Sequence, residues 1–232
     1  MKKIGIVTFN DYLNYGNRLQ VYALQYFLKN NFSEFVFQTV KYRVDQSSEK
    51  KRLITRIMSN ISLKKIITKL GNLLKRRKMK KLKSIKEQNL RLFSKKYINE
   101  SEKIYNKETK YQLNDDFDFF ISGSDQVWNP NFLYGDDVYF LQFTEYTKRI
   151  SYAPSFGISK IEKEYDVYKK LLNDFNYISV REEDGKKTVK EMTGRDVPVL
   201  VDPTLLLTKE DWYKIFPSKR KPIEKNIFLY IF

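Results

Sequence analysis

The sequence predicts an α/β fold in which a parallel β-sheet carries an inserted basic helical segment. Short β-branched or aromatic runs alternate with stretches of helical periodicity on either side of the insertion. The basic residues are concentrated in one stretch, since 49–96 holds 18 of the 44 Lys and Arg but only two of the 28 Asp and Glu. This leaves 26 basic and 26 acidic side chains elsewhere, so one stretch accounts for the net charge of +16.

The first predicted unit is a strand, a helix and a second strand. Residues 3–9, KIGIVTF, are a short apolar run bounded by turn residues, which is typical of a buried strand. In 17–30 the apolar side chains recur every three or four residues and predict a helix, with Asn17 as its N-cap. A second strand is expected over 35–42, FVFQTVKY. This order within about 40 residues is the βαβ unit of an open parallel sheet.

The basic stretch comes next. Leucine and isoleucine recur there at helical spacing, whereas 75–81, KRRKMKK, is almost entirely charged. We therefore expect two or more amphipathic helices over 50–96, within an insertion covering 49–113. Lysines beside an apolar stripe fit an anionic membrane surface better than nucleic acid, because no aromatic side chains for base stacking are interleaved. A helix face exposed only to solvent is the alternative.

After the insertion the alternation of strands and helices resumes. The expected strands are 117–123, 149–157, 177–182 and 197–201, and the expected helices are 163–175, 182–194 and 209–216, the last with Thr208 as N-cap. These elements complete a domain over 1–217. The polar, proline-marked stretch and apolar run at 218–232 are expected to be a linker and the first strand of a missing second domain.

Ligands of open parallel sheets bind where the strands end, so the polar loops leaving the predicted strands are the candidate site. The first loop supplies Asn14, Gly16, Asn17 and Arg18 at the start of a helix, where free N–H groups and a partial positive charge favour an anion. A tight turn at Gly16 with a cap at Asn17 is the alternative interpretation.

The second loop holds Gly123, Ser124, Asp125, Gln126 and Trp128. The carboxylate of Asp125 could accept a proton from a sugar hydroxyl, and Trp128 could stack on a sugar ring. The alternative is an aspartate that caps a turn beside a core tryptophan.

Two further loops follow. Arg181, beside Glu182, ends a predicted strand, and its guanidinium suits two-pronged binding of phosphate or carboxylate. An ion pair with its own neighbours is the alternative. Asp202 and Pro203 are expected to form a purely structural turn.

Composition excludes several kinds of chemistry. The chain contains no cysteine and no histidine, so disulfides, thiolate metal sites and imidazole catalysis by this chain are excluded. No apolar run approaches the roughly 20 residues needed to cross a bilayer, and the N-terminal run is too short for a signal peptide. We expect a cytoplasmic protein, with peripheral contact to the inner face of an anionic membrane through 50–96.

Five ordered segments resemble the polysaccharide pyruvyl transferase family: NYGNRLQVYALQ, FDFFISGSDQVWNP, RISYAPSFG, ISVREEDG and VLVDPTLLLTKEDW. The resemblance covers most of the chain except about 49–113. It implies a GT-B-like fold of two Rossmann-like halves, of which this chain is similar to the N-terminal half, with the active site in the cleft between them. Members of the family transfer an enolpyruvyl group from phosphoenolpyruvate to a sugar.

The resemblance also implies roles for individual residues. Arg181 and Asp125 are the expected catalytic residues, with phosphoenolpyruvate as donor substrate and no metal or other cofactor. The acceptor would be a sugar or lipid-linked glycan, a precursor of a cell-surface or exopolysaccharide. Because the family's histidine lies in the second half, this chain is expected to be inactive alone and to need a C-terminal half or partner chain. Alternatives are a non-catalytic module that binds nucleic acid or acidic polymer, and a GT-B glycosyltransferase that uses a nucleotide sugar.

Overall fold

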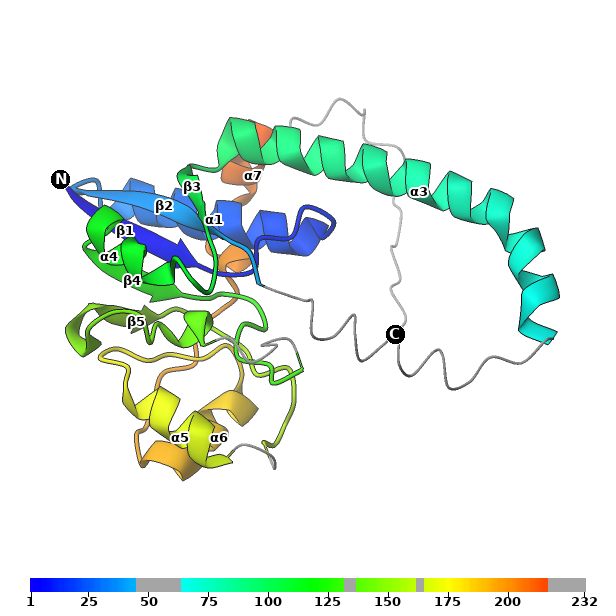
Figure 1. Cartoon of the computed structure of the whole chain (residues 1–232). Helices are drawn as coiled ribbons and strands as arrows, with labels where there is room; N and C mark the ends of the chain where they lie inside the picture. Colours follow the sequence, from blue (N-terminus) through cyan, green and yellow to red (C-terminus); the bar gives the residue numbers. More distant parts are fainter. Residues whose placement is uncertain (45–63, 132–136, 162–164, 217–232) are drawn as a thin grey trace, which may run out of the picture.

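The computed structural model describes residues 1–44, 64–131, 137–161 and 165–216, and only the backbone of 64–80. Its centre is a five-stranded parallel sheet of order β3-β2-β1-β4-β5 (Figure 1). The strands are β1 (Lys2–Val7), β2 (Phe35–Tyr42), β3 (Glu100–Tyr105), β4 (Phe119–Ser122) and β5 (Arg149–Ser151). The predicted α/β fold is therefore confirmed. The strand order changes direction between β1 and β4.

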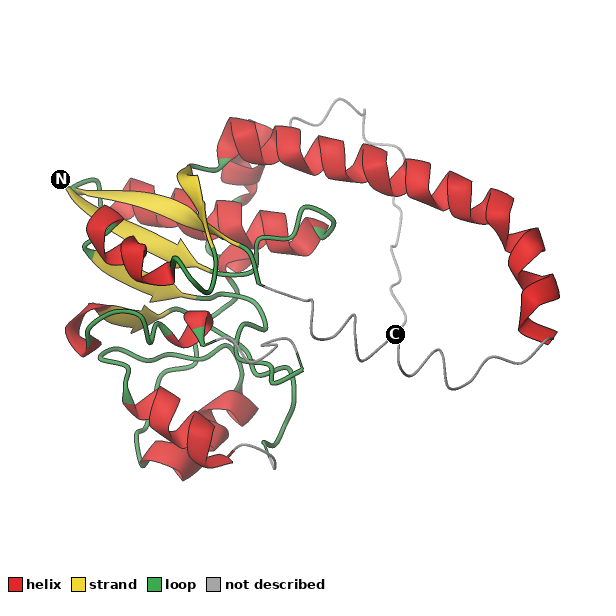
Figure 2. Ribbon diagram, viewed as in Figure 1, coloured by secondary structure: helices red, strands yellow, loops and turns green. Residues whose placement is uncertain are grey.

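Helices cover both faces of this sheet (Figure 2). One face is covered by α1 (Tyr15–Asn31), and the other by α4 (Leu113–Asp116), α5 (Tyr165–Asn173) and α6 (Glu183–Thr193). Helices α3 (Lys64–Tyr97) and α7 (Lys209–Ile215) pack with α1 in a third cluster. The core on the α1 face includes Ile4, Ile6, Leu24, Leu28, Phe37 and Ile121. The core on the other face includes Val7, Val40, Leu113, Phe120, Leu172 and Val189. Burial on both faces explains why the strands are nearly continuous apolar runs.

The start of α1 differs from the prediction. Asn14, not Asn17, is the N-cap, and its side-chain oxygen accepts a hydrogen bond from the backbone N–H of Asn17 at 3.2 Å. The helix thus begins three residues earlier than Asn17 would require. Asn17 lies inside the first turn, which leaves its side chain available for another contact.

The basic insertion also differs from the prediction. Residues 64–97 form one helix, α3, which continues through 75–81 and runs beyond the sheet (Figure 1). Lysine and arginine are good helix formers, so a charged run without Gly or Pro does not end a helix. The prediction of two or more helices is wrong for this part, and 45–63 lie outside the described residues. The range 49–113 is not helical throughout either, since it contains the edge strand β3.

The last two predicted strands do not form in the described structure, and β5 is shorter than the 149–157 predicted. Residues 177–182 and 197–201 contribute only single parallel bridges, Ile150 with Tyr177 and Val180 with Val199. Pro198 has no N–H for a ladder beside Val199, which fits this limited pairing. The Thr208 cap of α7 is confirmed as a capping box with Asp211. The strand expected within 218–232 lies outside the described residues.

Candidate functional site

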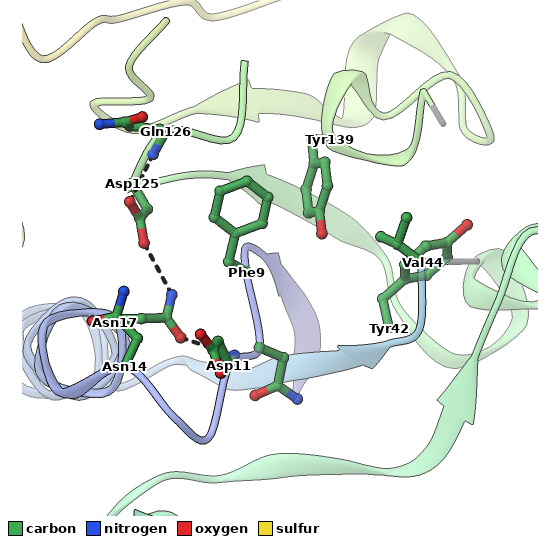
Figure 3. Close-up of a pocket in the computed structure, with 10 residues that line it drawn as sticks. Phe9, Asp11, Asn14, Asn17, Tyr42, Val44, Asp125, Gln126 and Tyr139 are labelled. Carbon is green, nitrogen blue, oxygen red and sulfur yellow. Dashed lines mark hydrogen bonds between the residues drawn. The ribbon is translucent and has the colours of Figure 1, made fainter. Parts of the chain in front are cut away.

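A pocket opens at the carboxyl edge of the sheet, where the loops after β1 and β4 meet (Figure 3). This is the point at which the strand order changes direction, and crevices of this kind hold the ligands of open α/β sheets. The pocket has a volume of about 550 Å³. It is lined by Phe9, Asn10, Asp11, Asn14, Asn17, Tyr42, Val44, Asp125, Gln126 and Tyr139.

The carboxylate of Asp125 accepts hydrogen bonds from both segments that border the pocket. Its Oδ2 accepts a hydrogen bond from Asn17 Nδ2 at 3.1 Å, and its Oδ1 accepts one from the backbone N–H of Gln126 at 2.8 Å. The backbone carbonyl of Asp125 also accepts from the N–H of Ser155 at 2.8 Å. Each carboxylate oxygen has further lone pairs, so a half-buried Asp125 can still accept a hydrogen bond from a ligand.

Asn17 is itself oriented from behind. Its Oδ1 accepts hydrogen bonds from Arg18 Nη2 at 2.8 Å, from Arg18 Nε at 3.3 Å and from the backbone N–H of Asp11 at 3.1 Å. Because three donors converge on this oxygen, the amide nitrogen must face the other way, toward Asp125. The hydrogen bonds from Arg18 therefore fix the orientation of the Asn17 side chain that contacts Asp125 in the pocket.

Arg18 lies beneath the pocket and not in it. The residue is fully buried and forms a 3.0 Å ion pair with Glu100 on β3. Burial lowers the pKa of Arg18, an effect that the charge of Glu100 opposes. The hydroxyl of Tyr12 donates to Glu100 at 2.9 Å, and the pKa of Tyr12 is raised by burial and by the neighbouring carboxylate. The prediction that Arg18 binds a ligand is wrong, because its guanidinium is fully buried and paired with Glu100.

The rest of the pocket is aromatic and amide in character. Phe9 and Tyr139 pack edge to face, with ring centroids 5.0 Å apart at 82°. Tyr42 and Val44 lie on the opposite side from Asp125 (Figure 3). The buried Oδ1 of Asn10 accepts no hydrogen bond within the described part of the chain. Aromatic faces with amide and carboxylate groups suit a ligand that has both apolar ring faces and hydroxyls.

Four of the predicted site residues, Asn14, Asn17, Asp125 and Gln126, line this pocket. Trp128 does not, because it is fully buried and stacks on Phe140 with ring centroids 5.5 Å apart. Its Nε1 donates to the carbonyl of Tyr139 at 3.2 Å. The prediction of sugar stacking by Trp128 is wrong, and the alternative of a core tryptophan is right.

The two predicted glycines and Ser124 have structural positions. Gly16 is exposed on the first turn of α1, outside the pocket lining. Gly123 has φ of +111°, and a Cβ there would lie 2.3 Å from the carbonyl oxygen of Tyr152. Ser124 is buried, and its hydroxyl donates to the carbonyl of Ala153 at 2.7 Å. Gly123 and Ser124 shape the loop that carries Asp125, and none of the three residues lines the pocket.

Arg181 and Glu182 lie further along the same sheet edge, outside the pocket lining. The guanidinium of Arg181 is 3.3 Å from Asp202 Oδ2 and 3.5 Å from Glu182 Oε2. Glu182 also accepts a hydrogen bond from the hydroxyl of Ser155 at 2.6 Å. This agrees with the alternative of an ion pair with neighbours. The side chain of Arg181 is still 23% exposed, so its role as a donor clamp stays a prediction.

Several residues that line the pocket were not among those predicted from the sequence. Asn10 and Asp11 carry the same signal that selected Asn14, since both follow the first strand directly. Tyr42 and Val44 stand at the end of the strand next to β1 and could have been found from the βαβ prediction. Tyr139 has no comparable signal. Within the described ranges no cluster of three or more acidic residues is placed to hold a metal ion, and no helix there could span a membrane.

The comparison with known proteins gives one positive finding. The family model described as polysaccharide pyruvyl transferase matches residues 14–232. No curated protein and no solved structure matches the chain. The family match begins at the N-cap of α1 and includes the described loops after β4 and β5. Because it covers most of the sequence, this chain belongs to the polysaccharide pyruvyl transferase family.

Proposed function

We propose that this chain provides the acceptor side of a transferase that moves a pyruvyl group from phosphoenolpyruvate to a sugar hydroxyl of a cell-surface or exopolysaccharide precursor. The observation that carries the proposal is the position of Asp125. Asn17 and the backbone of Gln126 hold its carboxylate at a pocket lined by amides and aromatic rings. No lysine or arginine belongs to the described lining, which favours a neutral sugar over a highly charged donor as occupant.

The reaction explains why a carboxylate is needed there. Protonation of the methylene carbon of phosphoenolpyruvate makes the adjacent carbon cationic, and a sugar hydroxyl attacks it. In our proposal Asp125 accepts the proton of that hydroxyl as the new C–O bond forms. Phosphate then leaves, and a second hydroxyl of the sugar closes a ketal. The products are the pyruvylated sugar and inorganic phosphate.

We propose that Arg181 contacts the donor substrate, phosphoenolpyruvate. Its guanidinium is partly exposed and lies on the same sheet edge as Asp125, although Asp202 and Glu182 already pair with it. A phosphate or carboxylate of the donor would have to displace one of these partners. This competition is consistent with a donor site that forms only when further groups close over the edge of the sheet.

Sugar binding by the purified chain tests the proposal. Saturation-transfer NMR with a panel of hexoses and N-acetylhexosamines is expected to detect at least one ligand. Asn17→Ala and Asp125→Asn should each weaken its binding about tenfold, which corresponds to roughly one hydrogen bond to a charged group. The matched control is Asn173→Ala, since Asn173 is exposed on α5 and, among the described residues, its side chain bonds only to its own helix.

Other outcomes contradict the proposal. If no sugar of the panel binds, or if Asp125→Asn binds as well as Asn173→Ala, the pocket is not an acceptor site. Binding that requires the nucleotide of a nucleotide sugar would favour a glycosyltransferase. We also expect no phosphate release from phosphoenolpyruvate by this chain alone, because the donor site expected for the family includes a histidine and the chain has none.

A further inference from the structure

A second pocket, here called the basic pocket, adjoins the candidate site. It has a volume of about 660 Å³ and shares Asn10 and Tyr42 with the first pocket. It lies between the end of β2 and the last turns of α3. Four basic side chains line it: Lys41, Arg43, Arg91 and Lys95. The first pocket, by contrast, is lined by two carboxylates and no basic side chain within the described residues.

Two elements place these charges together. Lys41 is the penultimate residue of β2 and Arg43 directly follows the strand, and both line the pocket. Arg91 and Lys95 are four positions apart on α3 and therefore share a helix face. Arg91 lies over the ring of Tyr12, 4.1 Å from its centroid, and pairs with Glu87 at 2.7 Å. Lys41 donates to the carbonyl of Glu102 at 3.0 Å.

Only part of the positive charge of the basic pocket is balanced: Glu87 pairs with Arg91, whereas no ion pair is formed by Lys41, Arg43 or Lys95 within the described residues. The one acidic residue in its lining is Glu100, which already pairs with the buried Arg18 at 3.0 Å. Arg43 and Lys95 are also exposed. The pocket is therefore suited to an anion with at least two negative charges.

The position of the basic pocket relative to Asp125 indicates which anion it takes. Tyr42, which both pockets share, lies across the first pocket from Asp125 (Figure 3). A reacting donor must reach the hydroxyl that faces Asp125, whereas an anion in the basic pocket would lie on the far side of the sugar. A group attached to the acceptor sugar at the end away from the reacting hydroxyl would extend into the basic pocket.

We infer that the basic pocket binds the phosphate or diphosphate that carries the acceptor sugar. This inference rests on the proposed function. A nucleoside diphosphate and a polyprenyl diphosphate offer the same anionic chemistry to these side chains, so the geometry assigns the diphosphate and not the group beyond it. Asn10, whose buried Oδ1 is without a hydrogen-bond donor in the described chain, lies where the sugar joins this group.

Inorganic pyrophosphate is the first probe. Calorimetric titration of the full chain should show binding that weakens with added salt. In the double variant Arg43→Gln/Lys95→Gln the affinity should fall at least about tenfold, because two charge contacts are lost. The control is Lys169→Gln/Lys190→Gln, which removes the same charge from exposed positions on α5 and α6. Equal loss in both variants would overturn the inference, since net charge alone would then explain the binding.

The second probe compares one sugar in three forms: free, as a nucleoside diphosphate conjugate, and as a short-chain prenyl diphosphate conjugate. Both conjugates should bind at least about tenfold more tightly than the free sugar, and the double variant should lose this advantage while it still binds the free sugar. Similar affinities of the two conjugates would show that only the diphosphate is recognised, and a preference for one would identify the source.

Other results would overturn the inference in distinguishable ways. If phosphoenolpyruvate loses affinity in the double variant while the conjugates do not, the basic pocket is a donor site. If free and conjugated sugars bind equally, the basic pocket has no role in acceptor binding. If pyrophosphate depends on Arg43 and Lys95 but no sugar binds in any form, the proposed function fails, and with it the assignment of the anion to the acceptor.

Discussion

Arg18 on α1 and Glu100 on β3 are 82 positions apart in the chain, yet they form a 3.0 Å ion pair around a fully buried guanidinium. The same guanidinium donates to Asn17 Oδ1 at 2.8 Å and to the carbonyl of Phe9 at 3.2 Å. The edge strand is thereby joined to the loop after β1. Through Asn17, the ion pair also fixes the side chain that holds Asp125.

Removal of Glu100 should destabilise the fold. Glu100→Ala leaves Arg18 buried without a counter-ion, and breaking a buried pair in this way costs about 3 kcal/mol or more. Urea denaturation should show this loss in the free energy of unfolding. Glu100→Gln keeps a hydrogen-bond acceptor and should lose less. Glu108→Ala, at an exposed position nearby, is the control and should change the free energy by less than about 0.5 kcal/mol. A Glu100→Ala variant as stable as this control would contradict the expectation.

The long-range pair also shows what sequence analysis could and could not provide. Hydrophobic periodicity predicted the strands around Ile4, Phe37 and Ile121, because a sheet buried on both faces needs continuous apolar runs. The rule that loops at strand ends form the site located Asn17 and Asp125. Periodicity gives a residue's position in an element, however, and not the partner that its side chain meets.

Arg18 and Trp128 illustrate this limit. Both stand in loops or first turns beside the site, where their chemistry suits a ligand. Glu100, the partner that draws Arg18 inward, lies on a strand within the range expected to be a helical insertion. Phe140, on which Trp128 stacks, ends a short 3-10 helix, Val138–Phe140, that no sequence pattern predicted. The direction of both side chains depends on contacts that neither local spacing nor composition encodes.

The two site glycines should respond oppositely to replacement by alanine. At Gly16 an added Cβ would meet only Asn14 Oδ1, at 3.4 Å, and the residue lies in the first turn of a helix. Gly16→Ala should therefore leave stability unchanged or raise it by about 0.5 kcal/mol. Gly123→Ala places a Cβ 2.3 Å from the carbonyl of Tyr152 at φ of +111° and should destabilise strongly. Thermal unfolding of both variants measures the contrast, and a destabilised Gly16→Ala would imply a backbone requirement that this geometry lacks.

Stability in acid should depend on Asp116. Hydrogen bonds from Lys103 and then from Tyr105 lower the pKa of this carboxyl in the folded state. Because the pKa of Asp116 is lower in the folded state, its ionised carboxylate stabilises the fold at pH values above the unfolded pKa, near 3.9. This stabilisation is lost as the pH falls through the folded pKa. Asp116→Asn should therefore be less stable than the native chain at pH 7, and the difference should narrow in acid. Urea midpoints measured from pH 7 downward test this.

The control for this pH dependence is Asp115→Asn. Asp115 is exposed, adjacent in sequence, and its side chain makes no hydrogen bond in the described structure. Its replacement removes the same charge and should give a much smaller difference in stability at neutral pH. If the effect of Asp116→Asn stays constant from pH 7 into acid, the hydrogen bonds to its carboxylate do not contribute to folding.

Helix α3 carries apolar side chains that the rest of the described fold leaves exposed. Its inner face packs through Leu90, which is buried, and through Phe93, whose ring lies 5.9 Å from that of Tyr22 on α1. Leu82, Ile85 and Leu92 are 51%, 45% and 65% exposed. These three residues fall on one side of the helix at spacings of three and seven. Lysines are frequent around them, as the charge of 49–96 requires.

An amphipathic helix with this distribution should bind anionic bilayers, because apolar side chains enter the interface while lysines meet anionic headgroups. We expect the chain to co-sediment with vesicles of phosphatidylglycerol and phosphatidylcholine, and not with phosphatidylcholine alone. The triple variant Leu82→Gln/Ile85→Gln/Leu92→Gln should bind at least about tenfold more weakly, since each leucine-sized side chain contributes about 1.5 kcal/mol on burial. Val167→Gln, at a position that is 56% exposed on α5, is the matched control. Equal binding to neutral and anionic vesicles would rule out the electrostatic part of this prediction, and an unaffected triple variant would rule out insertion of this helix face.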